Sequence, residues 1–399
     1  MVSYFAGITS STLSFIFVVF AIGALGYLVG GIKVKGIELG TAGVLLIALV
    51  YGILVHYVPS FTMGGKTITL FDSAIKSNFG VVSNIGTALF VTAVGLIAGP
   101  KFFRSFNRKT LAYILLGIII IGIGALTTVL FVLLDKNLSA DMAIGLLTGG
   151  LTSTPGLSAA KEVAKDPDQV VAGYGIAYLF GVLGVVLFVQ LLPKILKVNM
   201  KEEVAHFHAA NAITIPEPKG KLISLDPFGF FAFFFAVALG CFIGAIKIPG
   251  INFSLGNSGG TLLGGLIVGH FAHIAKIDCR IKKETLNFMR ELGLVLFLIG
   301  AGVPGGVNFV ANVKISYFVY GAVMTLLPMI LGYIIARYVF HLSILNNLGS
   351  ITGGMTSTPA LGTLIATAGT DEVSSAYAAT YPFALVSVVL AAKIILMVM

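Results

Sequence analysis

The 399-residue chain has no tryptophan, only two cysteines and few charges: Asp, Glu, Lys and Arg together make up 10% of it. A soluble domain carries about a quarter charged residues, so this composition excludes an ordinary water-soluble fold. Cys241 and Cys279 have neither metal-binding nor redox spacing, and they do not predict a disulfide framework. Without tryptophan, any aromatic belt at the membrane surfaces must consist of Tyr and Phe.

Apolar residues dominate what is present. They make up 57% of the chain, and the mean hydropathy is +1.02. We therefore expect an all-α polytopic membrane protein, embedded in the bilayer of the cell (inner) membrane. The formal charge of +9 reports topology in such a protein, so it does not indicate a nucleic-acid partner. Residues 1–20 lack a basic region, and their apolar run continues to Gly31, which indicates a span rather than a cleaved signal peptide.

Ten apolar runs are long enough to cross a bilayer, and they fall into two series of five. The first series lies near 11–31, 40–58, 82–100, 110–134 and 171–193, and the second near 227–246, 259–275, 291–307, 316–340 and 375–397. The longest polar stretch, 199–226, separates them and is too short for a folded domain. The predicted organisation is a first repeat at 1–198, a cytoplasmic linker at 199–226 and a second repeat at 227–399.

A nonapeptide that occurs twice carries the strongest signal. GGLTSTPGL at 149–157 and GGMTSTPAL at 353–361 share seven of nine residues. The flanking residues match in the same order; Gly86, Phe90, Gly95 and Gly99 correspond to Gly293, Phe297, Gly302 and Gly306, and the pair Tyr174/Tyr178 to Tyr377/Tyr381. These matches indicate an internal duplication, which is the organisation of many secondary transporters.

The nonapeptide predicts a helix stop, a short extended piece and a new helix. Two glycines end a helix easily because Gly tolerates the left-handed conformation, whereas Ser or Thr followed by Pro favours a new helix start. Each flanking arm of about ten residues reaches roughly 15 Å, half the hydrocarbon thickness. We therefore expect a re-entrant helical hairpin in each repeat, at 141–164 and 346–368, with its tip near the midplane.

Basic residues favour this topology over one in which the motif segments cross the membrane. With hairpins, each repeat has five transmembrane helices, the repeats are inverted and both termini lie outside. The inside loops then hold 17 of the 25 Lys and Arg, namely Lys33, Lys35, Lys101, Arg104, Arg108, Lys109, Lys194, Lys197, Lys201, Lys219, Lys221, Lys276, Arg280, Lys282, Lys283, Arg290 and Arg337. With crossing segments, the groups at 194–221 and 276–290 move outside, against the positive-inside rule.

Irregular backbone at membrane depth is tolerated where it is buried in protein or lines a wet cavity, so the two tips predict a binding site. The half-helices aim positive ends at the midplane, which favours carboxylates. The substrate-binding candidates are Thr152, Ser153, Thr154, Pro155, Thr356, Ser357, Thr358 and Pro359. The cation-binding candidates are Gly149, Gly150, Gly353, Gly354 and Asn84, whereas no metal site is expected. The structural alternative is that both motifs are only kinks.

The charged residues are interpreted as peripheral to this site. Asp135, Asp141, Glu162, Asp166, Asp168, Asp371 and Glu372 are placed toward loops or hairpin ends, and Arg290 with Glu291 at the cytoplasmic interface. No Lys or Arg is expected at the tips. The tyrosine pairs are interpreted mainly as packing residues, with substrate binding as the alternative. The glycines of the third span in each half either break the helix or permit close packing.

The chain resembles the aspartate:alanine exchanger family of bacterial and archaeal transporters. The resemblance rests on the paired TSTP motifs and on LFVTAVGLIAGPKFF at 89–103, echoed by LFLIGAGVPGGVNFV at 296–310, and it covers nearly the whole chain. It implies two homologous membrane halves, termini outside, and exchange or uptake of amino acids or C4-dicarboxylates. Members usually carry cytosolic regulatory domains between the halves, where this chain has only a linker. A weaker resemblance to glutamate:sodium symporters keeps sodium coupling open.

We thus expect a secondary active transporter of small carboxylates such as succinate or aspartate, working by elevator-like alternating access as Na⁺-coupled uptake or as exchange. No cofactor is expected beyond Na⁺ as a coupling ion, and the spans outside the hairpins are expected to support a homodimer. The alternative is a cation/proton antiporter or an ion channel. An intramembrane enzyme with Ser153 or Ser357 as nucleophile ranks last, because no base lies within local sequence reach.

Overall fold

A computed structural model describes residues 15–34, 37–38, 40–63, 66–102, 111–198, 222–248, 253–312, 314–369 and 373–399. The first part of the chain forms α2 (Phe15–Gly30), β1 (Lys33–Val34), β2 (Ile37–Glu38), α3 (Ala42–Tyr57), β3 (Ser60–Met63), β4 (Lys66–Thr69), α4 (Ser73–Phe102), α5 (Leu111–Leu134), α6 (Ala140–Gly150), α7 (Thr154–Val163) and α8 (Pro167–Ile195). Most of the linker, 199–221, lies outside the described residues.

The second part repeats this order of elements. It forms α10 (Phe230–Ala245), β5 (Lys247–Ile248), β6 (Phe253–Ser254), α11 (Gly256–Phe271), β7 (His273–Ile274), β8 (Ile277–Asp278), α12 (Lys283–Asn312), α13 (Ile315–Tyr338), α14 (Ile344–Gly354), α15 (Thr358–Ala368) and α16 (Ser374–Val398). Each pair of short strands forms an antiparallel hairpin. The duplication seen in the sequence is therefore also a duplication of secondary structure.

The helices fit a polytopic membrane protein. Six of those in the described residues are long and apolar enough to cross a bilayer: α4, α5, α8, α12, α13 and α16. Three further helices, α2, α3 and α10, are apolar but shorter. All ten sequence-predicted spans overlap a helix. Two helices begin earlier than predicted, α4 at Ser73 and α12 at Lys283, because their first turns are polar and fall outside a hydropathy window.

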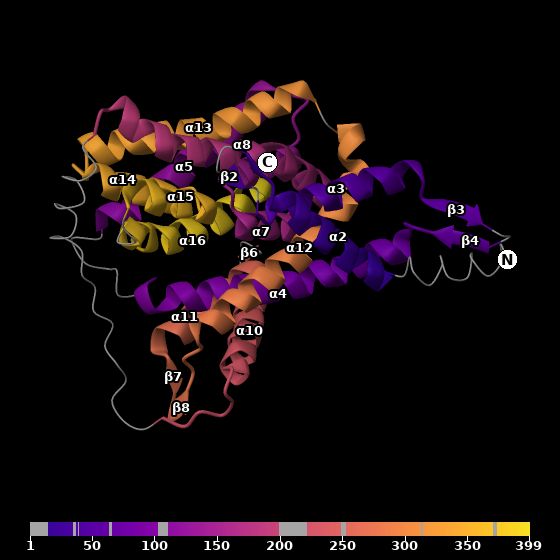
Figure 1. The fold of residues 1–399 in the computed structure, drawn as a ribbon, viewed down its shortest axis with the longest axis horizontal. Helices are drawn as coiled ribbons and strands as arrows, with labels where there is room; N and C mark the ends of the chain where they lie inside the picture. Colours follow the sequence, from indigo (N-terminus) through magenta and orange to yellow (C-terminus); the bar gives the residue numbers. More distant parts are fainter. Residues whose placement is uncertain are drawn as a thin grey trace.

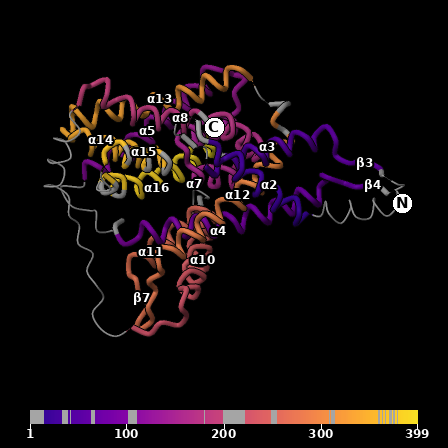
Figure 2. Tube along the Cα trace, viewed as in Figure 1, coloured from indigo at the N-terminus to yellow at the C-terminus, as the bar shows by residue number. Residues whose placement is uncertain are grey.

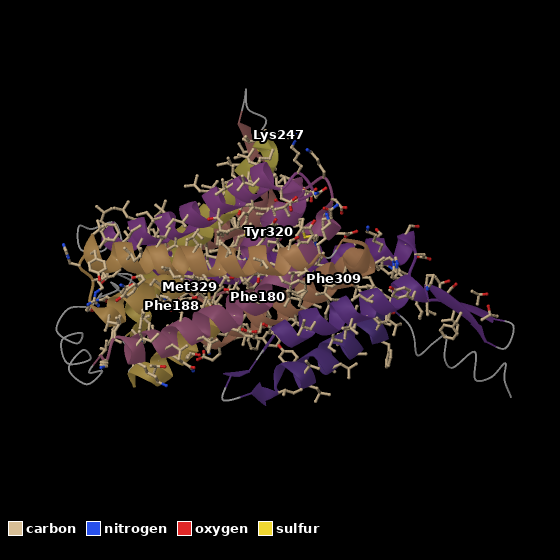
Figure 3. All side chains as sticks on the ribbon, turned by 90° about the horizontal axis from the view of Figure 1, so that it is seen from above. Phe180, Phe188, Lys247, Phe309, Tyr320 and Met329 are labelled. Atoms are coloured by element: carbon tan, nitrogen blue, oxygen red, sulfur yellow. The ribbon has the colours of Figure 1, made fainter. Side chains whose placement is uncertain are left out.

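The helices form two bundles (Figures 1 and 2). One, the crossed-helix bundle, consists of α2–α4 and α10–α12, and the other, the tip-bearing bundle, consists of α5–α8 and α13–α16. In the tip-bearing bundle α8 lies beside α13 (Figure 3), where the rings of Phe180 and Phe188 contact Phe318 and Tyr333 at centroid distances of 6.2 and 6.3 Å. Both bundles draw equally on the two halves of the chain.

Reciprocal glycines hold the crossed-helix bundle together where α4 crosses α12. A Cβ atom on Gly86 would lie 2.3 Å from the backbone nitrogen of Phe297, and one on Gly293 would lie 2.4 Å from that of Phe90. The crossing therefore requires a residue without a side chain on both helices. Both helices run unbroken through their glycines. The packing interpretation of these glycines is thus confirmed, and the helix-breaking alternative is wrong.

Candidate functional site

The two TSTP motifs form the same break between two short helices. The helix α6 ends at Gly150 and α7 begins at Thr154, and α14 and α15 are separated at the same motif positions. In the first break the N–H of Thr152 donates to the carbonyl of Gly149, and the N–H of Ser153 donates to that of Thr148. This is the Schellman pattern that closes a helix carboxyl end. The second break repeats both hydrogen bonds in residues 352–357.

The residue that takes the left-handed conformation is a threonine in both breaks. Thr152 has φ of 52° and Thr356 has φ of 51°, whereas the glycines before them stay helical. The prediction that Gly-Gly supplies the left-handed residue is therefore wrong. A Cβ atom on Gly149 would lie 2.5 Å from a backbone oxygen of α8, and one on Gly353 would lie 2.8 Å from a backbone oxygen of α16. These glycines serve close packing.

The two tips bind each other through these threonines. The Thr152 hydroxyl donates to the backbone carbonyl of Met355 at 3.0 Å, and the Thr356 hydroxyl donates to that of Leu151 at 2.9 Å. All four residues are buried. A β-branched residue is unfavourable at positive φ, so each hydrogen bond offsets a local backbone cost. The two hydroxyls line the site, yet their protons are directed to the opposite tip.

The amino ends of α7 and α15 differ. Ser153 caps α7, since its hydroxyl accepts from the N–H of Gly156 at 3.2 Å, and Pro155 follows in the first turn as predicted. Ser357 occupies the same position before α15, but its buried hydroxyl has no hydrogen-bond partner within the described part of the chain. The side chains of Thr358 and Pro359, two further candidates, lie outside what the structure describes.

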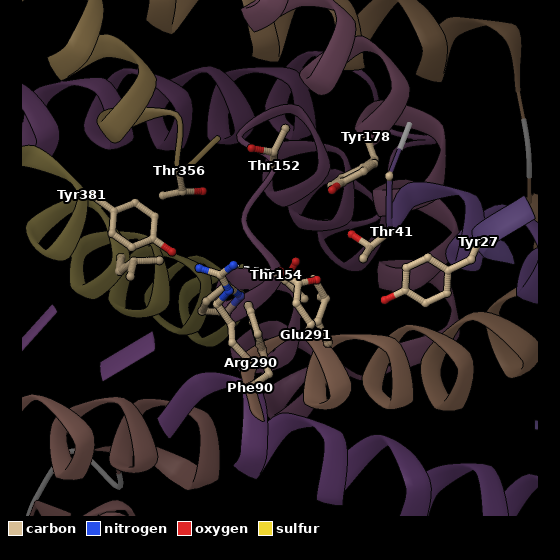
Figure 4. A pocket seen from close by; sticks show the side chains of 14 residues that line it. Tyr27, Thr41, Phe90, Thr152, Thr154, Tyr178, Arg290, Glu291, Thr356 and Tyr381 are labelled. Carbon is tan, nitrogen blue, oxygen red and sulfur yellow. Dashed lines mark hydrogen bonds and ion pairs between the residues drawn. The ribbon is translucent and has the colours of Figure 1, made fainter. Parts of the chain in front are cut away.

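A cavity of about 350 Å³ lies between the two bundles at the tips (Figure 4). The crossed-helix bundle contributes Tyr27, Gly40, Thr41, Phe90, Arg290, Glu291 and Leu294 to its lining. The tip-bearing bundle contributes Thr152, Thr154, Pro155, Tyr178, Thr356, Tyr381 and Leu385. Four of the eight predicted substrate-binding residues therefore line one cavity, together with residues from both halves of the chain.

Two charged residues that the sequence analysis assigned to the cytoplasmic interface line the cavity. Arg290 and Glu291 form an ion pair at 2.8 Å, and their side chains are 27% and 43% exposed. They lie about 10 Å along α12 from its first residue, Lys283, rather than at a helix end. The expectation that no basic residue stands at the tips is wrong, because α12 extends two turns before the apolar run. The amphipathic spacing of Leu286 and Met289 before Arg290 is a sequence signal for these turns.

The tyrosine pairs have one member in the cavity and one beneath it. Tyr178 and Tyr381 line the cavity, and each packs against its partner, Tyr174 or Tyr377, with ring centroids 4.9 Å apart. The hydroxyl of buried Tyr174 lies 3.1 Å from that of Thr154. The inner tyrosines, Tyr174 and Tyr377, are buried packing residues. The outer tyrosines, Tyr178 and Tyr381, can offer their hydroxyl groups to a ligand in the cavity.

Of the five cation candidates, three glycines have carbonyls with protein partners, and Asn84 lies away from the cavity. The carbonyls of Gly149 and Gly353 accept backbone hydrogen bonds at the tips, and that of Gly150 accepts from the Thr325 hydroxyl at 3.3 Å. Asn84 is exposed and is not among the residues that line the cavity. Among the residues that line the cavity, the negative side chain is Glu291, whose carboxylate is paired with Arg290.

Comparison with protein families gives a match over most of the chain. Residues 17–194 and 232–397 match the family model Asp-Al_Ex, described as a predicted permease membrane region. The two matched segments leave out residues 195–231, which contain the linker.

Relatives over nearly the full length carry transporter names. An uncharacterized transporter of Bacteroides thetaiotaomicron is 28% identical over 95% of this chain and 97% of its own length. A putative transport protein of Klebsiella pneumoniae is 22% identical over 90% of this chain and 94% of its own. The first alignment runs over 539 positions, more than the 399 residues of this chain, so that relative has stretches that this chain lacks.

Proposed function

Because the chain belongs to the Asp-Al_Ex family of predicted permeases, we propose that it is a secondary active transporter of small carboxylates such as succinate or aspartate. One observation carries the proposal: Arg290 reaches a cavity that both TSTP tips line and that lies between two separate bundles. A charge at membrane depth is costly and marks a functional site.

Arg290 accounts for the carboxylate. A guanidinium matches a carboxylate with two parallel hydrogen bonds, and it stays charged at all physiological pH values. Tyr178 and Tyr381 offer hydroxyl groups to the remaining substrate oxygens. Glu291 adds a negative charge beside Arg290, and in Figure 4 it lies toward Tyr27 and Thr41.

Glu291 bears on what accompanies the carboxylate. A dicarboxylate that entered alone would bring two negative charges beside this carboxylate, and uncompensated charge in a membrane interior is unfavourable. An acidic amino acid brings an ammonium group, which Glu291 can bind. Succinate lacks one, so we expect it to bind together with Na⁺. Exchange of one carboxylate for another equally avoids leaving the site with unbalanced charge.

Alternating access completes the proposal. We propose that the α6–α7 and α14–α15 pairs are re-entrant hairpins of two inverted repeats, with both chain termini outside. Support comes from the equal order of elements in the two halves and from the reciprocal contact of the tips. The tip-bearing bundle then moves against the crossed-helix bundle in an elevator-like way, and the cavity between them opens to each side in turn.

The test is uptake of labelled aspartate and succinate by proteoliposomes, empty or preloaded with substrate, with and without a Na⁺ gradient. Arg290→Gln removes a charged hydrogen bond of about 1.5–3 kcal/mol, so we expect half-saturation to need roughly 10- to 150-fold more substrate. Arg337→Gln is the matched control, because Arg337 is exposed near the carboxyl end of α13.

Three outcomes would reject the proposal. Arg290→Gln with unchanged half-saturation would show that this guanidinium does not bind substrate. Uptake that follows only a pH gradient, and needs neither Na⁺ nor internal substrate, would indicate a protonated substrate. Cation fluxes without any carboxylate uptake would favour the antiporter or channel alternative.

A further inference from the structure

Apart from the ion pair of Lys76 on α4 with Asp168 on α8, the polar contacts between the two bundles in the described residues gather around α7, away from the cavity. The carboxylate of Glu162 accepts from the backbone N–H of Ser258 at 2.7 Å and from the Ser258 hydroxyl at 2.8 Å. Its second oxygen accepts from the ammonium group of Lys393 at 2.8 Å, and the Lys393 side chain is only 1% exposed. Glu162 and Lys393 belong to the tip-bearing bundle, whereas Ser258 lies in the first turn of α11 in the other bundle.

Further contacts extend this cluster along α7. The hydroxyl of Ser158 lies 2.7 Å from that of Ser258 and 3.1 Å from that of Thr87 on α4. One turn further on, the ammonium group of Lys161 donates to the hydroxyl of Ser83 at 3.1 Å. Every one of these bonds joins α7 to the crossed-helix bundle, so none can persist if the two bundles slide past each other.

The amino end of α11 is shaped for the Glu162 carboxylate. Gly256 opens this helix with φ of +65°, and a Cβ atom there would lie 2.0 Å from a carboxylate oxygen of Glu162. The free N–H groups of a helix start and its positive dipole end favour a carboxylate. The absence of a side chain at Gly256 and the charge of Glu162 therefore serve the same contact.

In the second half, the positions equivalent to Ser158 and Glu162 cannot form such a cluster. At the motif-equivalent positions of Ser158 and Glu162, α15 carries Gly362 and Ala366, which have no polar side-chain group. The amino end of α3, the counterpart of α11 in the first half, instead lines the cavity through Gly40 and Thr41. Of the two equivalent helix starts, that of α11 thus binds a carboxylate from α7, whereas that of α3 lines the cavity.

We propose that Glu162, Lys393 and Ser258 form a latch, which holds the bundles in the orientation seen here and must open whenever the cavity changes sides. The inference rests on the proposed transport function. Because Glu162 and Lys393 lie on the same bundle, the ion pair travels intact and leaves no unpaired charge behind. Within the latch, only the hydrogen bonds from Glu162 to Ser258 on α11 are lost, so the latch can open and close repeatedly.

The first test locks the latch covalently. Ser158→Cys and Ser258→Cys are introduced together in a chain with Cys241→Ser and Cys279→Ser, and the cysteines are oxidised in proteoliposomes. The disulfide should abolish carboxylate uptake, and reduction should restore it. The control pair is Thr62→Cys with Thr67→Cys, because these hydroxyls lie 3.4 Å apart within one strand hairpin, where a disulfide should leave uptake unchanged. Full uptake with the Ser158–Ser258 positions crosslinked would overturn the latch.

The second test needs no substrate. Leu294→Cys places a reporter thiol in the cavity wall, and a membrane-impermeant maleimide is applied to vesicles of either orientation. When Glu162 is unchanged, the thiol should react with maleimide from one side of the membrane. Adding Glu162→Gln should increase its reaction from the other side. Glu284→Gln, on the exposed first turn of α12, is the control. Equal labelling patterns for both substitutions would overturn the latch, whereas shifted labelling without carboxylate uptake would support it and reject the proposed substrate.

Discussion

The contact between the two tips can be tested by substitutions that separate its hydrogen bond from its backbone cost. Thr152→Val keeps the shape of the side chain and the unfavourable φ, but leaves the buried carbonyl of Met355 without its donor. The loss should be about 1–3 kcal/mol in the free energy of unfolding, the cost of an unsatisfied buried carbonyl. Thr152→Gly also removes the hydroxyl, but it relieves a left-handed conformation worth about 1–2 kcal/mol. Thr152→Ser keeps the hydroxyl that donates to Met355. The expected order of stability among the three variants is therefore Ser at or above Gly, with Val lowest.

The measurement is equilibrium unfolding of each purified variant in mixed micelles, with the same series at Thr356 as an internal replicate. Since the two hydrogen bonds share one contact, the double substitution to Val should cost less than the two single costs added together. A Val variant as stable as the unsubstituted chain, or a Gly variant less stable than the Val variant, would refute the reciprocal contact.

Two further predictions concern the crossed-helix bundle. Gly86→Ala should destabilise this bundle by about 1–3 kcal/mol, because the added methyl group meets the backbone of α12. Gly80→Ala on the same helix meets nothing within 4 Å and should stabilise the bundle by about 0.5–1 kcal/mol. Thermal unfolding of both variants checks this difference. Hydrogen bonds from four backbone N–H groups, of which that of Phe231 has the largest effect, lower the pKa of Asp226 just before α10. Its stabilising effect should be complete above about pH 4 and disappear as pH falls through the lower folded-state pKa, so the difference in Tm between the unsubstituted chain and Asp226→Asn should vanish in acid.

Much of the architecture follows from composition and repetition. Apolar runs of about 20 residues have one stable form in a bilayer, so helix positions were predictable to within a few residues for most spans. The break at each TSTP motif was predictable because Ser and Pro favour a helix start. The inversion of the repeats and the topology remain predictions.

The charged part of the site was not predictable in the same way. Hydropathy places Arg290 and Glu291 at the edge of a span, and only the length of α12 and its crossing with α4 bring them to the tips. Glu162 and Lys393 are separated by 231 positions along the chain, so no local pattern links them. A duplicated sequence shows which residues correspond, but not which ones the packing of two bundles brings together.

Under the proposed alternating access, the polar contacts of Ser158 and Glu162 on α7, whose motif counterparts on α15 are Gly362 and Ala366, imply that the two orientations of the cavity differ in free energy. A binding-competent state that is only partly populated weakens the apparent affinity of its ligand in proportion to its population. Substrate arriving from the side that faces the favoured orientation therefore meets a ready site, while substrate from the opposite side meets mostly occluded molecules. We expect the substrate concentration at half-saturation to differ between the two directions of transport. The ratio of the two concentrations then reports how far the contacts of the two duplicated halves have diverged.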